Sequence, residues 1–121
     1  MADKSQNFRD VLVWQKAHAF TLAVYRASEP FPKHELFALT SQLRRSAASI
    51  PANFEEGFRK RTTPDKPKFY NIAQGSADEC LYHLILAHDL GYADTLKLQT
   101  DLEEVSRLLQ GYINGLNRDG S

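Results

Sequence analysis

Apolar residues in the last third of the chain recur in alternating steps of four and three. They are Leu98, Leu102, Val105, Leu109, Tyr112 and Leu116. This spacing places all of them along one side of an α-helix, whereas the two-residue alternation of a half-buried strand occurs nowhere in the sequence. The pattern predicts an all-α fold in which each helix buries one side against the others.

Two prolines separate the first two helices. The first helix is expected over 8–28 and must end there, because Pro30 and Pro32 lack the backbone N–H and disfavour helical backbone before them. Its apolar positions are Val11, Leu12, Ala19, Leu22 and Tyr25. The second helix is expected over 33–60.

The second helix carries a seven-residue apolar repeat and an internal proline. The repeat consists of Leu36, Leu43, Ile50 and Gly57. Pro51 lies inside it without shifting its phase, so we expect the helix to kink there and to continue. A proline also releases the carbonyl four residues earlier, that of Ala47, which then needs another hydrogen-bond donor. Polar side chains on the same helix are one candidate source of that donor.

The third helix is expected over 69–90, where Gly91 can end it. The fourth begins after a cap by Asp94 or Thr95. Four helices of similar length joined by short connections favour an antiparallel, up-down-up-down four-helix bundle.

Length and composition are those of one ordinary globular domain. The chain has 121 residues, of which 42% are hydrophobic and 25% charged, and these fractions exclude a disordered or fibrous protein. We expect the bundle over 8–117, a disordered tail over 1–7 and a frayed end over 118–121. The single cysteine, Cys80, is expected to be a buried core residue. No membrane span or signal peptide is recognisable, so we expect a cytoplasmic protein without a membrane partner.

Charge is balanced overall but uneven along the chain. The 15 basic and 15 acidic residues cancel, which excludes a general polycation. Residues 44–77, however, carry seven basic and three acidic groups, whereas residues 78–121 carry three and eight. The basic side chains of the middle stretch are Arg44, Arg45, Arg59, Lys60, Arg61, Lys66 and Lys68. They form a candidate phosphate-binding surface, with Phe58 and Tyr70 close enough in sequence to stack on bases.

A stripe of short polar side chains accompanies the apolar repeat of the second helix. Because long charged residues would be expected on a solvent face, amides and hydroxyls indicate a partly buried hydrogen-bonded network between helices or subunits. Together with two residues of the third helix, the network is expected to include Gln42, Ser49, Asn53, Glu56, Ser76 and Glu79.

No constellation for catalysis or metal binding is apparent. The four histidines lack the i, i+4 pairing of a zinc helix, and no Glu-x-x-His motif of a di-iron bundle occurs. Glu79 and His83 are four residues apart and could form an acid–base pair, although such a pair is more typical of a structural contact. Gly75 fits no phosphate loop and is typical of close helix packing. We therefore expect no cofactor, no metal and no enzymatic activity.

Several motifs together resemble one protein family. They are SQLRRSAASIPANFEEG around Gln42 to Gly57, LVWQKA from Leu12 to Ala17, Phe31 with Pro32, and IAQGSADE from Ile72 to Glu79. In this order and spacing the chain is similar, from about Phe8 to Leu116, to the 23S ribosomal RNA intervening-sequence proteins. The matching signature positions are Gln42, Arg44, Arg45, Ser49, Ile50, Pro51, Asn53, Glu56, Gly57, Gly75, Ser76 and Glu79.

The resemblance implies a four-helix bundle that assembles into a ring-shaped homopentamer. It also implies kinship with the accessory variability determinant of diversity-generating retroelements, a basic pentameric partner of a reverse transcriptase and its RNA. This chain departs from that branch in being neutral. Two functions follow as hypotheses: a nonenzymatic adaptor that binds structured RNA, or a scaffold that recruits a protein partner without touching RNA.

Overall fold

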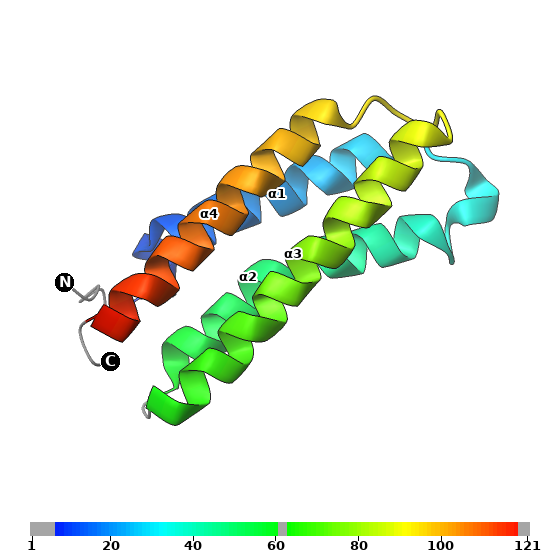
Figure 1. Ribbon diagram of the computed structural model, residues 1–121. Helices are drawn as coiled ribbons and strands as arrows, with labels where there is room; N and C mark the ends of the chain where they lie inside the picture. The colour runs from blue at the N-terminus through cyan, green and yellow to red at the C-terminus, as the bar shows by residue number, and fades with distance from the viewer. Residues whose placement is uncertain (1–6, 61–62, 119–121) are drawn as a thin grey trace.

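The computed structural model describes residues 7–60 and 63–118, which form four long helices and no strand (Figure 1). The helices are α1 (Leu12–Ser28), α2 (Leu39–Arg59), α3 (Lys66–Asp89) and α4 (Leu96–Arg118). Short 3₁₀ turns occupy Phe8–Asp10, Lys33–Glu35 and Thr63–Asp65. The tails expected over 1–7 and 118–121 lie, except for Asn7 and Arg118, outside the described residues. The all-α prediction is confirmed.

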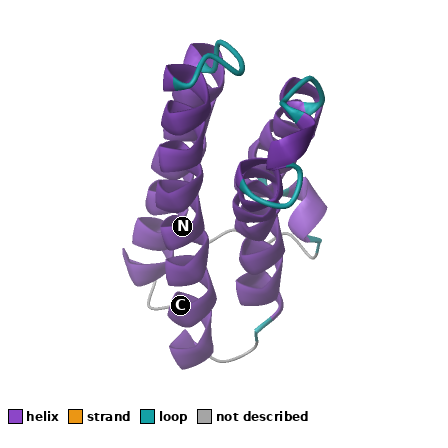
Figure 2. Ribbon diagram, turned by 90° about the vertical axis from the view of Figure 1, so that its right-hand side faces the viewer, coloured by secondary structure: helices purple, strands orange, loops and turns teal. Residues whose placement is uncertain are grey.

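Each helix packs against two others. α2 contacts α1 and α3, and α4 contacts the same two helices from the other side. In Figure 1 each helix starts at the end of the molecule where the preceding one stops, so the start of α1 and the end of α4 lie at the same end. Figure 2 shows the helices as two adjacent columns joined by short loops.

The core runs the full length of the bundle in two apolar clusters. One contains Leu43, Ile50, Leu84 and Leu102, and the second contains Phe54, Tyr70 and Leu109. In α4 the predicted stripe is confirmed: all its members are buried except Tyr112, which is half-buried.

Apart from Val11, which is 3% exposed, the apolar face predicted for α1 was wrong. Its buried side consists of Val13, Ala17, Phe20 and Val24, whereas Leu12, Leu22 and Tyr25 are 41–51% exposed. Both sets recur at helical spacing. Only the position of α1 against α2 and α4 decides which set is covered.

The first two helices begin later than expected. α1 starts at Leu12 because a 3₁₀ turn capped by the Asn7 side chain precedes it. α2 starts at Leu39 because Ala38 has non-helical dihedral angles, which separate the helix from the turn before it. As a consequence Leu36, the first member of the seven-residue repeat, is 47% exposed, while the other members are buried.

Pro51 is buried inside α2, and the helix continues through it. The hydroxyl of Thr21 in α1 donates to the carbonyl oxygen of Ala47, at an oxygen–oxygen distance of 3.2 Å. The donor therefore comes from a neighbouring helix, and the expectation that the polar stripe of α2 supplies it was wrong. The kink at Pro51 stays a prediction.

Candidate RNA-binding end and polar groove

The predicted polar network lies where α2 faces α3. The hydroxyls of Ser49 and Ser76 are 2.8 Å apart, which joins the two helices by a hydrogen bond. The Asn53 amide donates to the Ser49 carbonyl at 2.9 Å and lies 2.8 Å from its hydroxyl. Because these groups are only partly buried, they order the helix contact while remaining reachable from solvent.

Next to these bonds the surface is hollowed into a groove of about 430 Å³. Its walls are formed by Gln42, Arg45, Ser46, Ser49, Ser76 and Glu79. Four of the six predicted network residues thus line one groove. Asn53 contacts its edge through Ser49, whereas Glu56 forms an ion pair with Lys60 at 3.8 Å.

Most of the predicted basic residues gather where α2 passes into α3, at one end of the bundle. Arg59 and Lys60 end α2, and Lys66 and Lys68 begin α3. Arg61 lies outside the described residues. We call the four described side chains the basic end.

Two aromatic rings lie among these cations. The Arg59 guanidinium is 5.1 Å from the centroid of the Phe8 ring. The ammonium groups of Lys60 and Lys68 are 4.9 and 5.7 Å from the Phe69 ring. Cations over aromatic faces at these distances are weakly attracted to them, which restrains the otherwise flexible side chains. The basic end therefore presents charge and aromatic surface together.

The aromatic residues expected at this surface were the wrong ones. Tyr70 is 1% exposed and packs on Phe54, while Phe58 packs against the same core cluster. The rings that meet the cations are Phe8 and Phe69. Phe69 adjoins Lys68 in the sequence, but only the fold brings Phe8 to the end of α2.

The cations of the basic end differ in how strongly they are held. Exposed ion pairs to Glu55 (3.3 Å) and Glu56 (3.8 Å) restrain Arg59 and Lys60, and such i, i+4 pairs are worth only about 0.3–0.5 kcal/mol each. Lys66 instead donates to the carbonyls of Gly57 and Phe58 at 3.2 and 3.3 Å and so caps α2. Partial burial lowers the pKa of its ammonium group.

Arg44 and Arg45 do not belong to the basic end. Arg44 faces α1, where its Nε donates to the Ser28 hydroxyl at 2.8 Å and its guanidinium lies 5.0 Å from the Tyr25 ring. Arg45 lines the polar groove. Since an α-helix rises 1.5 Å per residue, both lie about 20 Å along α2 from Arg59. The structure thus distributes the predicted basic surface over three places.

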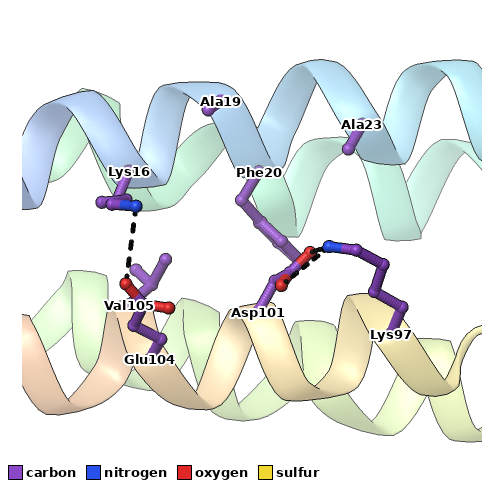
Figure 3. A pocket seen from close by; sticks show the side chains of 8 residues that line it. All are labelled: Lys16, Ala19, Phe20, Ala23, Lys97, Asp101, Glu104 and Val105. Carbon is purple, nitrogen blue, oxygen red and sulfur yellow. Dashed lines mark hydrogen bonds and ion pairs between the residues drawn. The ribbon is translucent and has the colours of Figure 1, made fainter.

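A second hollow, of about 230 Å³, lies between α1 and α4 (Figure 3). Its cations face carboxylates: Lys16 pairs with Glu104 at 3.6 Å and Lys97 with Asp101 at 2.9 Å. Phe20 from α1 and Val105 from α4 belong to its apolar lining (Figure 3). Its charges are already compensated, so this hollow offers less to an anionic partner than the basic end does.

The structure joins no acid–base pair at Glu79 and His83. His83 is 7% exposed and its Nδ1 has no hydrogen-bond partner, and over 7–60 and 63–118 no ion pair links it to Glu79. Within the same residues no three His, Cys, Asp or Glu side chains are grouped as metal ligands. None of the described helices combines the length and apolar character needed to cross a membrane.

Gly75 has no close neighbour from another element among the described residues. A Cβ added at this position would meet no atom within 4 Å, so the packing expected there does not occur inside the monomer. Gly57 is different, because a Cβ there would lie 2.5 Å from the ring of Tyr70. Gly57 thus permits the close contact of α2 with α3.

The comparisons with known proteins agree with this architecture. A crystal structure of a protein of unknown function from the S23 ribosomal protein family of Bacteroides thetaiotaomicron shares 26% sequence identity and superimposes with a TM-score of 0.75. The match covers 84% of this chain and 98% of that one. Among curated proteins none matches. The model of the 23S rRNA-intervening sequence protein family matches residues 9–111, and the chain belongs to this family.

Proposed function

We propose that this protein is a nonenzymatic, cytoplasmic RNA-binding adaptor and that its basic end contacts the RNA. The observation that carries the proposal is the placement of three cations, Arg59, Lys60 and Lys68, against the rings of Phe8 and Phe69. Phosphates are neutralised by such cations, and unpaired bases stack on aromatic and guanidinium planes. The name of the family supports an RNA partner.

The existing ion pairs do not prevent this role. The carboxylates of Glu55 and Glu56 compensate Arg59 and Lys60 only weakly, because one partner of each pair is exposed and the other partly exposed to solvent. An arriving phosphate can therefore replace them at little cost. Lys68 is exposed and lies beside Phe69, so it offers its charge directly.

We further propose that the protein assembles as a homopentamer, as the family resemblance implies. Repetition of a modest basic end around a ring would supply avidity that one neutral subunit lacks. The outer side of α3 supports an interface between subunits: Ile72 and Tyr82 are 43% and 60% exposed, and Gly75 leaves room for close approach. Native mass spectrometry tests the stoichiometry, and Tyr82→Asp should dissociate the assembly while Leu96→Asp, equally exposed on α4, should not.

The RNA proposal is tested with two charge-matched triple variants. One variant replaces Arg59, Lys60 and Lys68 by Gln. The other is the control and replaces by Gln three cations that are exposed elsewhere on the bundle, Lys16, Lys97 and Arg107. Both remove one arginine and two lysines. Fluorescence anisotropy with a structured RNA is recorded over a series of salt concentrations, with helicity checked by circular dichroism.

We expect the first variant to lose most of its affinity for RNA. The slope of log affinity against log salt concentration should become shallower by about 2–3, because each lost phosphate contact contributes about 0.7–0.9 to it. The second variant should keep the wild-type slope. Equal losses in both variants would mean that only total charge matters and would contradict a located site. No binding by the wild-type protein at low salt would refute the proposal.

The second candidate function is a protein scaffold that recruits a partner without direct RNA contact. It is favoured by Phe37, whose side chain is 92% exposed and follows the half-exposed Leu36 in the turn before α2. Exposed large apolar residues that lie together are typical of protein contacts. A partner that survives nuclease treatment in a pull-down and is lost with Phe37→Ser, but not with the triple Gln variant at the basic end, would support this function instead.

A further inference from the structure

An open pocket of about 220 Å³ lies where α1 ends and α2 begins. Its polar lining comes from Ser28, Glu29, Lys33, Thr40 and Arg44, and its apolar wall from Phe31, Pro32 and Leu36. It is separate from the basic end and from the groove between α2 and α3. Its two cations and its apolar wall set the kind of molecule that it can hold.

Thr40 points to a missing partner in this pocket. Its side chain is 3% exposed, and its Oγ1 has no hydrogen-bond partner among the described residues. A buried hydroxyl without a partner is costly, and native proteins rarely leave one unsatisfied. Because this oxygen is covered in the structure, a bound acceptor reaches it only if the Thr40 side chain or the pocket wall shifts.

Arg44 is held in place with donors to spare. Its Nε donates to the buried Ser28 hydroxyl at 2.8 Å, and one terminal nitrogen lies 3.4 Å from the Tyr25 carbonyl. The Tyr25 ring, 5.0 Å away, fixes the plane of the guanidinium. Since an arginine carries five N–H donors, the remaining ones form a rigid fork suited to a carboxylate.

We propose that this pocket binds a small monocarboxylate with an apolar, ring-sized body. The fork of Arg44 and the Thr40 hydroxyl would receive the carboxylate, Lys33 would add long-range attraction, and Phe31 would cover the apolar part. Glu29 at the pocket repels a second negative charge, so a single carboxylate suits the site better than a phosphate dianion. The volume is sufficient, because a cavity of about 150 Å³ already holds benzene.

The probe is benzoate, titrated into the ¹⁵N-labelled full chain and followed by amide chemical shifts. Benzamide has the same shape without the charge, and inorganic phosphate has charge without the ring. The variants are Arg44→Gln and Thr40→Val. The matched control is Arg45→Gln, which removes the same charge one residue further along α2, in the groove on the other side.

We expect benzoate to shift amides of 28–44 and benzamide to shift them far less. Arg44→Gln should weaken binding at least about tenfold, since an ionic hydrogen-bonded pair is lost, and Thr40→Val several-fold, while Arg45→Gln should change nothing. A short peptide that ends in a phenylalanine carboxylate, compared with its amide, separates a chain terminus from a free acid as the source of the carboxylate.

Equal binding of benzamide and benzoate, displacement of benzoate by phosphate, or equal effects of the two arginine variants would overturn the proposal. So would unshifted amides over the whole titration. If Arg44→Gln does not fold, Thr40→Val and Lys33→Gln decide the matter, because neither residue makes a hydrogen bond on which the helix contacts depend. None of these outcomes depends on whether the basic end binds RNA.

Discussion

The hydroxyl of Thr21 in α1 lies 3.2 Å from the carbonyl oxygen of Ala47 in α2, the group that Pro51 leaves without its helical donor. The same hydroxyl lies 2.9 Å from the carbonyl of Ala17 in its own helix. Thr21 is 8% exposed, so water has little access to this point. The single hydroxyl proton is shared between the two carbonyls, so a side chain on α1 replaces in part the N–H that Pro51 lacks.

Thr21→Val should lower the free energy of unfolding by about 1–3 kcal/mol, because the shape is kept and the buried Ala47 carbonyl loses its donor. Urea denaturation measures this change. Thr100→Val is the control: Thr100 also donates to the carbonyl four residues back, at 3.2 Å, but on the exposed side of α4, so the cost should be close to zero.

A double-mutant cycle isolates the relationship between Thr21 and Pro51. Pro51→Ala restores a backbone N–H that can bond to the Ala47 carbonyl, so in that background Thr21→Val should cost clearly less. If the cost of Thr21→Val is the same with and without Pro51, the hydroxyl does not compensate for the proline.

Gly57→Ala should destabilise the fold by about 1–3 kcal/mol, because the added methyl group would overlap the ring of buried Tyr70. Thermal or urea unfolding reveals the change. Gly111→Ala is the matched control in α4, where a Cβ meets no atom within 4 Å. Gly111→Ala should raise the free energy of unfolding by up to about 1 kcal/mol, because alanine has a higher helix propensity than glycine. A neutral Gly57→Ala would mean that α2 and α3 can move apart freely.

Stability should depend on pH through Glu35. The Tyr92 hydroxyl donates to its Oε2 at 2.7 Å, and this hydrogen bond, which the desolvation of the carboxyl opposes, holds the pKa of Glu35 below its ordinary value of 4.5. Because the pKa of Glu35 is lower in the folded state, the ionised carboxylate contributes to the free energy of unfolding. This contribution is complete above pH 4.5 and disappears as the pH falls through the pKa of Glu35 in the folded protein.

Tyr92→Phe should therefore reduce stability at neutral pH and lose its effect in acid, as seen in urea unfolding over a pH series. Tyr82→Phe provides the comparison, because among the described residues the Tyr82 hydroxyl, unlike that of Tyr92, donates to no carboxylate, so this variant should show no such dependence. A difference between Tyr92→Phe and wild type that stays constant from neutral pH to below 4.5 would exclude Glu35 as its source.

Cys80 should be inert in the folded protein. It is 0% exposed, and burial raises the pKa of its thiol to about 12, so almost no thiolate forms at neutral pH. Reaction with a disulfide reagent should be slow in buffer and fast in denaturant. Rapid native labelling would show that α3 opens locally.

Local pattern determined the helices. The spacing of Leu98, Leu102 and Val105 fits an α-helix and no strand. Pro30 and Pro32 end the first helix as expected. The buried cysteine and the polar contact of Ser49 with Ser76 also follow the helical register, since residues on one side of a helix must share surroundings. The family resemblance rested on the same segments, and the match over 9–111 agrees with it.

Tertiary packing decided what the pattern left open. Two apolar stripes of α1 had equal helical spacing, and only the contact with α2 and α4 buried Phe20 and exposed Leu22. Arg44 and Arg45 lie on different sides of α2, because adjacent residues on a helix face different directions. Arg44 therefore contacts α1, and Arg45 lines the groove between α2 and α3. Phe8 reached Arg59, and Thr21 reached Ala47, across long sequence separations. Such pairs arise from how whole helices dock, and no local spacing encodes them.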